Sequence, residues 1–255
     1  MRHRFLSASS LALAALLSGC GQESTQPVSV TTSTLSKGLA AWWSFEETGD
    51  TARDLSGNGH HLSLHDATRP AGRSGKGLGL SGAVTSFGQC TLVKGLNLDT
   101  FTLVTWIQTS ASSSHQALVS RESSSGFPSN YRLLLDGPDN LASTYRPGHV
   151  SLDGQLSTQS FQAGNVTGSS KAIDDGIWHL VVATGSAKQA KIWIDGKLDT
   201  THTMATAFKA DSVAPLDIGR SGYQAAGGYP FRGILDEVRI YSRVLDSSEI
   251  QELLR

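Results

Sequence analysis

The sequence predicts an all-β domain, a two-sheet antiparallel jelly-roll sandwich that ends in one short C-terminal helix. Short runs in which apolar and polar residues alternate recur along residues 38–255, and a period of two is typical of half-buried strands. Clusters of Gly, Asp, Asn and Ser separate these runs, as turns do. Helical spacing occurs only near the end of the chain, so the pattern excludes an α/β nucleotide-binding fold.

Residues 1–19 have the order of a secretory signal peptide. Arg2 and Arg4 precede an apolar stretch over residues 5–17, which is shorter than the about 20 apolar residues that a membrane-spanning helix needs. The motif Leu17-Ser18-Gly19-Cys20 resembles the bacterial lipobox, which implies that Cys20 is lipidated and becomes the first residue after cleavage. Gly21 follows it, and in Gram-negative lipoproteins this favours the outer membrane. An ordinary signal peptide with an incidental cysteine is the alternative.

Behind Cys20, residues 20–37 are rich in Ser, Thr and Gln and predict a flexible tether. Residues 38–255 are then long enough for one larger all-β domain.

Cys90 is the second of only two cysteines, so we expect it to be a buried, small apolar side chain rather than half of an internal disulfide. The formal net charge of −1 and the lack of Lys/Arg runs argue against nucleic acid as a partner.

Five runs have the clearest strand pattern, and two stretches read instead as long loops or weak strands. The five runs are Phe101–Ile107, Tyr131–Leu135, Trp178–Ala183, Lys191–Ile194 and Gly233–Tyr241. The stretches without a clear pattern are 111–126 and 148–175. Asp195-Gly196 between two of the runs predicts a hairpin, because Asp-Gly tolerates the positive φ angles of a two-residue turn.

The terminal helix is expected to begin at Asp246. Asp246-Ser-Ser-Glu249 has the form of a capping box, in which Asp caps a free amide and Glu reaches back to the cap residue. Ile250, Leu253 and Leu254 then share one face of the helix.

Several segments in order resemble the laminin-G-like domains of the concanavalin A-like lectin/glucanase superfamily. These segments are Leu39–Glu47, Arg53–His61, Gly72–Gly82, Phe101–Trp106, Asp175–Val181, Ile192–Lys197, Gly233–Tyr241 and Leu245–Ile250. Gly79 stands where that family usually has a polar residue. The resemblance implies a jelly roll of two antiparallel sheets that binds a glycan or an extracellular protein, often with one calcium ion, and it implies no particular ligand.

A calcium site is predicted at Asp54, Asn58 and Asp236. The turn 54–58 offers carboxylate, amide and backbone oxygens, which are the ligands calcium requires. Alternation puts Asp236 in the same row as Ile234, Val238 and Ile240, where a buried carboxylate needs donors or a cation. The alternative is that Asp54 and Asn58 only make local turns and that Asp236 accepts amide hydrogen bonds.

Ligand binding is predicted at loop aromatics rather than at the five tryptophans, since tryptophans on strands are more often core residues. Tyr145, Arg146, Tyr223 and Tyr229 lie in Gly/Pro-rich connections, where an exposed ring can hold a sugar or an extracellular protein. The alternative is that the tyrosines cover the edge of the core.

Catalysis is not expected. A retaining glycosidase needs two carboxyl groups about 5 Å apart, and the laminarinase-like Glu-x-Asp-x-x-Glu motif does not occur in the sequence. The neighbouring acidic residues Asp236 and Glu237 would point to opposite faces of a strand. We therefore expect a membrane-anchored binding module, with an adhesive or structural lipoprotein as the alternative and a hydrolase or polysaccharide lyase as the less favoured one.

Overall fold

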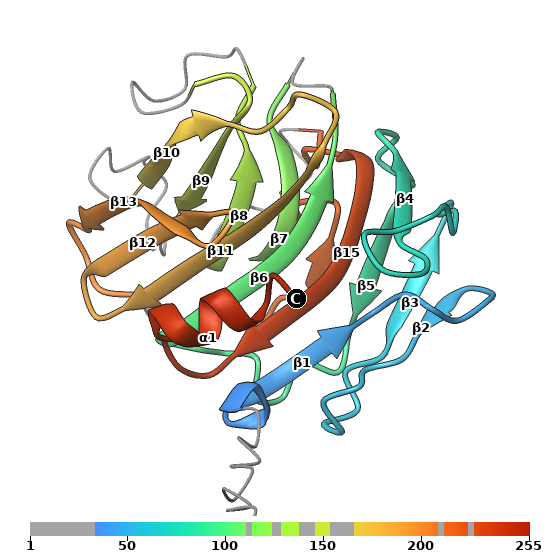
Figure 1. Ribbon diagram of the computed structural model, residues 1–255. Coiled ribbons are helices and arrows are strands. Elements are labelled where there is room, and N and C mark those ends of the chain that lie inside the picture. Colours follow the sequence, from blue (N-terminus) through green and yellow to red (C-terminus); the bar gives the residue numbers. More distant parts are fainter. Residues whose placement is uncertain are drawn as a thin grey trace, which may run out of the picture. The chain divides into compact units, whose positions relative to one another are not determined.

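The computed structural model describes residues 34–110, 114–123, 129–137, 146–153, 166–208, 212–223 and 227–255. Thr34–Arg255 forms one compact unit, in which two antiparallel sheets pack as a sandwich (Figure 1). The predicted fold class is therefore confirmed. Cys20, the signal peptide and nearly all of the predicted tether lie outside the described residues.

The chain forms fifteen described strands, with a short 3₁₀ helix before them and one short α-helix after them. The elements are η1 (Thr34–Ser36), β1 (Leu39–Trp43), β2 (Thr51–Ala52), β3 (Leu62–His65), β4 (Leu78–Ser81), β5 (Phe87–Cys90), β6 (Thr100–Gln108), β7 (Gln116–Glu122), β8 (Ser129–Leu135), β9 (His149–Asp153), β10 (Val166–Ala172), β11 (Trp178–Ser186), β12 (Gln189–Ile194), β13 (Lys197–Thr203), β14 (Leu216–Ile218), β15 (Arg232–Tyr241) and α1 (Ser247–Glu252).

The seven-stranded sheet has the order β1-β15-β6-β11-β12-β13, and β4 pairs with β15 beside this path. All five runs with the clearest pattern became strands, four of them in this sheet. Asp195 and Gly196 have φ angles of 52° and 74° and join β12 to β13, so the predicted hairpin is confirmed.

The eight-stranded sheet has the order β10-β9-β8-β7-β14-β5-β3-β2. Its strands β7, β9 and β10 come from the two stretches that read as loops or weak strands. Polar residues fill the outward positions of these strands, and register shifts interrupt β7 and β10, so the alternation is weak in the sequence.

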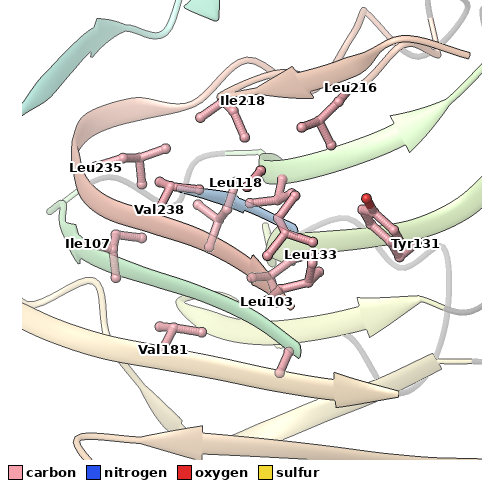
Figure 2. Packing of buried hydrophobic residues seen from close by; sticks show 14 of the residues in the cluster. Leu103, Ile107, Leu118, Tyr131, Leu133, Val181, Leu216, Ile218, Leu235 and Val238 are labelled. Carbon is pink, nitrogen blue, oxygen red and sulfur yellow. The ribbon is translucent and has the colours of Figure 1, made fainter. Parts of the chain in front are cut away.

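The core lies between the two sheets. Figure 2 shows Leu103, Ile107 and Val181 of the seven-stranded sheet together with Leu133 and Ile218 of the eight-stranded sheet, all of them buried. Cys90 is also fully buried in this core, and burial raises the pKa of its thiol. The prediction that Cys90 acts as a small apolar side chain is confirmed.

Helix α1 packs on the outer face of the seven-stranded sheet (Figure 1). The predicted capping box is present, because the Asp246 carboxylate accepts from the amides of Ser248 and Glu249 while Glu249 accepts from the amide of Asp246. Within the part of the chain that the structure describes, no helix has both the length and the apolar character to cross a membrane.

The compact unit begins at Thr34, four residues before the predicted boundary. Arg243 is the cause: its guanidinium donates to the carbonyl oxygens of Thr34 and Lys37 at 3.1 and 2.6 Å. It also pairs with Glu249, and its hydrogen bonds lower the Glu249 pKa to about 2. The start of the domain is therefore bound to its closing helix.

Of the five tryptophans, only Trp43 lies in the core between the sheets. Trp106, Trp178 and Trp193 pack instead around α1, and Trp42 donates its indole N–H to Glu237 at 2.9 Å. The expectation that strand tryptophans are core residues therefore holds fully for one of them. Trp106, Trp178 and Trp193 belong to the outer cluster instead.

Candidate functional site

Polar side chains line the outer face of the eight-stranded sheet, which points away from the core. Strand pairing places one residue from each of seven strands in a single row across the sheet, because side chains alternate between the two faces. The row runs Thr51, Ser63, Gln89, Asp217, Ser120, Arg132 and Asp153. The next row along the strands, which includes Leu64, Ile218 and Leu133, is apolar and points into the core. The row is therefore polar, but Asp217, Ser120, Arg132 and Asp153 are at most 3% exposed, so this part of the outer face is a buried polar layer.

Arg132 lies between two carboxylates on this face. Its Nη1 donates to Glu122 Oε1 at 2.9 Å, and its Nε and Nη2 donate to Asp153 Oδ2 at 2.9 and 2.5 Å. Each of the three side chains is at most 3% exposed. Burial raises the Glu122 pKa, and the positive charge of Arg132 opposes this rise only in part. The two carboxylates thus both engage one guanidinium, which ties β7, β8 and β9 together.

At the other end of this face a groove of about 630 Å³ opens beside β3, β5 and β14. Phe87, only 8% exposed, lines the groove, and its ring stacks on the His65 ring with the centroids 4.4 Å apart. The guanidinium carbon of Arg220 lies 3.2 Å from the Phe87 centroid. The His65 imidazole and the Arg220 guanidinium therefore both contact the Phe87 ring, and the face of an aromatic ring attracts a cation such as the guanidinium.

Asp217 holds Arg220 in this position. Arg220 Nε donates to Asp217 Oδ2 at 3.4 Å, and Gln89 Nε2 donates to Asp217 Oδ1 at 2.8 Å. Asp217 is only 2% exposed, and burial raises its pKa although Arg220 attracts its negative charge. Asp217 is thus a positioning residue beneath the groove.

The groove has the chemistry of a small-molecule site. Its volume lies within the roughly 300–1,000 Å³ of typical ligand pockets. Arg220 and His65 offer donors, while the exposed carboxylates of Asp50 and Asp66 offer acceptors. Val84, 43% exposed, adds an apolar wall. Donors, acceptors and apolar surface in one groove suit a ligand that carries many hydroxyl groups on an apolar ring.

Asp54 and Asn58 of the predicted calcium site serve the turn in which they lie. Asp54 Oδ1 accepts from the amides of Trp42 and Ser56, and its Oδ2 accepts from the amide of His60 and the hydroxyl of Ser56. These hydrogen bonds lower the Asp54 pKa despite its burial. Asn58 Nδ2 donates to the carbonyl oxygen of Ala40 at 2.9 Å. The oxygens of Asp54 are therefore already supplied with protein donors.

Asp236 belongs to a different part of the fold. Its Oδ2 accepts from the Ser74 amide at 3.0 Å and its Oδ1 from the Glu237 amide at 2.7 Å. The Gly-rich turn over 72–77 thus binds a carboxylate of the protein itself. Burial raises the Asp236 pKa to about 6.

The predicted row for Asp236 is wrong. Glu237 has a φ of 51°, and the pairing of β15 with β6 shifts register between Asp236 and Arg239. Because this bulge changes the alternation by one residue, Leu235 and Val238 both enter the core, as Figure 2 also shows. Asp236 pairs with Trp106 on the outer face instead.

The three predicted calcium ligands therefore do not come together as one donor set. Within the described ranges, no three or more His, Cys, Asp or Glu side chains are grouped so that they could hold a metal ion. The residues Asp54, Asn58 and Asp236 do not fit one shared site, and calcium binding elsewhere in the protein stays a prediction.

The predicted ligand-binding tyrosines are less exposed than expected. Tyr229 is only 8% exposed and packs with Ala117 and Leu134, so the expectation of an exposed ring is wrong there. Tyr223 is half-buried against the same cluster. Arg146 is exposed, and Tyr145 lies outside the described residues.

Sequence reasoning missed His65, Phe87, Asp217 and Arg220. Each of them lies on or beside a short strand, and their contacts cross three strands that are distant along the chain. The only local signal is the alternation in Phe87–Cys90, which puts Phe87 and Gln89 on one face.

Comparison with known families gives one match over most of the domain. The sequence model of the concanavalin A-like lectin/glucanases superfamily, of the laminin G type, matches residues 85–251. No curated protein sequence matches the chain.

Two similar solved structures are binding domains or ancillary domains of larger proteins. Domain 4 of AbnA, an extracellular arabinanase from Geobacillus stearothermophilus in complex with arabinotriose, is 18% identical with a TM-score of 0.63, over 85% of this chain and 98% of that one. The binding domain of Paraclostridial Mosquitocidal Protein 1 is 18% identical with a TM-score of 0.62, over 86% of this chain and 52% of that one. The chain thus spans about half the length of the toxin domain. At these identities the likeness shows the fold alone.

A third similar structure is the sialidase of Trypanosoma rangeli, which is 18% identical with a TM-score of 0.58. The match covers 85% of this chain but only 32% of the sialidase chain.

Proposed function

Because the chain belongs to the concanavalin A-like lectin/glucanases superfamily, we propose that its domain is a binding module without catalytic activity that holds an extended glycan. The groove around Phe87 is the binding site in this proposal. In this groove of about 630 Å³, the rings of His65 and Phe87 and the guanidinium of Arg220 stack beside exposed hydrogen-bond donors and acceptors.

Support for a glycan comes from the chemistry of the groove and from one similar domain. Arg220 is held by a buried carboxylate before any ligand arrives, so its donors are already oriented and a ligand pays little ordering entropy. The arabinanase domain of similar fold was solved with arabinotriose. Binding of an extracellular protein is the second candidate, because the similar toxin structure is a binding domain.

Support for a role without catalysis comes from the sequence. The laminarinase-like Glu-x-Asp-x-x-Glu motif, which would supply two convergent carboxyl groups, does not occur in it. Release of reducing ends from any glycan that binds would contradict this part of the proposal.

We further propose that the module is anchored to the cell envelope through acylated Cys20 and residues 20–33, in the outer membrane if the host is Gram-negative. Support comes from the lipobox-like Leu17-Ser18-Gly19-Cys20. We also propose that ligand binding depends on calcium. The ion would then need oxygen ligands other than a shared set of Asp54, Asn58 and Asp236.

The test is a glycan array probed with the soluble domain and with three variants. His65→Ala removes the exposed ring that stacks on Phe87, and it should abolish or weaken every positive signal. His202→Ala, in the other sheet, is the matched control and should leave the signals unchanged. Tyr223→Ala tests the loop site: loss of signal in this variant, with full signal in His65→Ala, would move the ligand to the loops and overturn the groove proposal.

A further inference from the structure

A second cavity lies on the opposite sheet, away from the groove. It has a volume of about 200 Å³ and lies between the Gly-rich turn, strands β6 and β15, and the end of the chain after α1. Its lining includes the arginines Arg73, Arg239 and Arg255, the apolar residues Val104, Trp106, Leu253 and Leu254, and the polar residues Ser74 and Glu237. The cavity therefore combines apolar walls with three positive charges and one negative charge.

Within the described residues, Arg73 and Arg255 line this cavity without an acidic partner, and Arg73 is the one that stacks on an aromatic ring. Its guanidinium carbon lies 4.6 Å from the centroid of the Trp106 ring, and its side chain is exposed. Arg239 by contrast pairs with Glu237 at 2.5 Å. Stacking on an aromatic ring leaves the edge of a guanidinium, with its N–H donors, free for an anion.

The turn that carries Arg73 is held in place by two carboxylates. Asp236 accepts from the Ser74 amide at 3.0 Å, and Glu46 accepts from the Lys76 amide at 3.1 Å. A Cβ at Gly72 would lie 2.6 Å from Asp236 Oδ2, and one at Gly75 would also clash with the Glu46 carboxylate. Glycine at these positions therefore lets both carboxylates approach the backbone of the turn closely.

We infer that this cavity is a second binding site, which takes a carboxylate attached to a single ring of about the size of one sugar. The carboxylate would accept from Arg73, and the ring would lie against Leu253 and Val104. The volume is below the roughly 300 Å³ at which pockets for larger ligands begin, which favours one ring over a chain. Glu237 would repel the ligand if Arg239 did not neutralise it. This site is independent of the proposed glycan groove, which lies on the other sheet.

Isothermal titration of the soluble domain with glucuronate, glucose and acetate tests the inference. Glucuronate should bind, while glucose, which lacks the carboxylate, and acetate, which lacks the ring, should bind at least tenfold more weakly. Equal binding of glucose, or binding of acetate as tight as that of glucuronate, would overturn the site as stated.

Two variants locate the glucuronate. Arg73→Gln removes a charge-assisted hydrogen bond and should weaken binding about tenfold or more, without loss of melting temperature because the turn is held by its backbone. Arg53→Gln removes one exposed arginine elsewhere and is the matched control. Glu237→Gln frees Arg239 and should strengthen binding several-fold. Glucuronate affinity unchanged in Arg73→Gln, or lowered in a stably folded Glu237→Gln, would contradict the inference. His65→Ala should not affect glucuronate, which separates this site from the groove.

Discussion

Replacing Arg132 with methionine should destabilise the domain strongly. The change removes the guanidinium that Glu122 and Asp153, at 1% exposure each, both engage. Removing one partner of a buried pair costs about 3–5 kcal/mol, because the other charge is left uncompensated. For a domain of this size each kcal/mol lowers the melting temperature by about 2–4 °C, so the expected loss is on the order of 6–20 °C.

The loss should also depend on pH. Burial raises the Glu122 pKa above its value in the unfolded chain, so its contribution to stability is present below the unfolded pKa and is lost as the pH rises through the folded pKa. Without Arg132 the folded pKa rises further. The difference in unfolding free energy between variant and wild type should therefore be larger at pH 7 than at pH 4.5.

Urea denaturation at both pH values, followed by tryptophan fluorescence, measures both effects. Lys171→Met is the control, because Lys171 pairs with Asp195 at 46% and 36% exposure and such a surface pair contributes at most about 1 kcal/mol. If Arg132→Met lowers the unfolding free energy no more than Lys171→Met does, and by the same amount at both pH values, Arg132 does not stabilise the fold by pairing with the buried carboxylates.

Four further predictions concern Asp236, calcium, Asp54 and Cys20. The Asp236 pKa is raised to about 6, so the unfolding free energy of the wild type should fall by on the order of 2–3 kcal/mol between pH 4 and 7. Asp236→Asn should lack this part of the fall. Parallel plots of unfolding free energy against pH for the two proteins would contradict the prediction. Calcium at a hundredfold excess over its dissociation constant should stabilise the fold by about 2.7 kcal/mol. Melting curves that superimpose with calcium and with chelator would contradict the predicted calcium site. Asp54→Asn should lower the melting temperature equally in both conditions, because Asp54 serves its turn. Cys20→Ser should abolish labelling by a fatty-acid analogue and release the protein from membranes, and retained labelling would exclude Cys20 as the anchor.

Features that depend on neighbouring residues could be predicted from the sequence. The hairpin at Asp195-Gly196 and the capping box at Asp246 both follow from contacts within four residues. The strands with strong alternation, such as β6 and β15, were predicted for the same reason. The bulge at Glu237 was not predicted, because a positive φ at a non-glycine residue is uncommon and an unbroken alternation also fits Ile234, Asp236, Val238 and Ile240.

The polar face could not be predicted because it depends on which strands pair. Arg132 meets Glu122 across 10 residues and Asp153 across 21, and Gln89 meets Asp217 across 128. A search for neighbouring acidic residues in the sequence does not find such contacts. The loop tyrosines were chosen because they are near glycine and proline, but a loop residue such as Tyr229 can fold back on a sheet.

Mapping the amide resonances of the domain with the strongest glycan of the array tests whether the ligand binds in the groove around Phe87. Titration of the labelled domain should shift the amides of His65, Gly88 and Asp217, which belong to the three strands beside the groove. The amides of β12 and β13 should stay unchanged. Shifts confined to residues 221–223, or to the turn around Arg73, with none at His65, Gly88 and Arg220, would contradict binding in the groove.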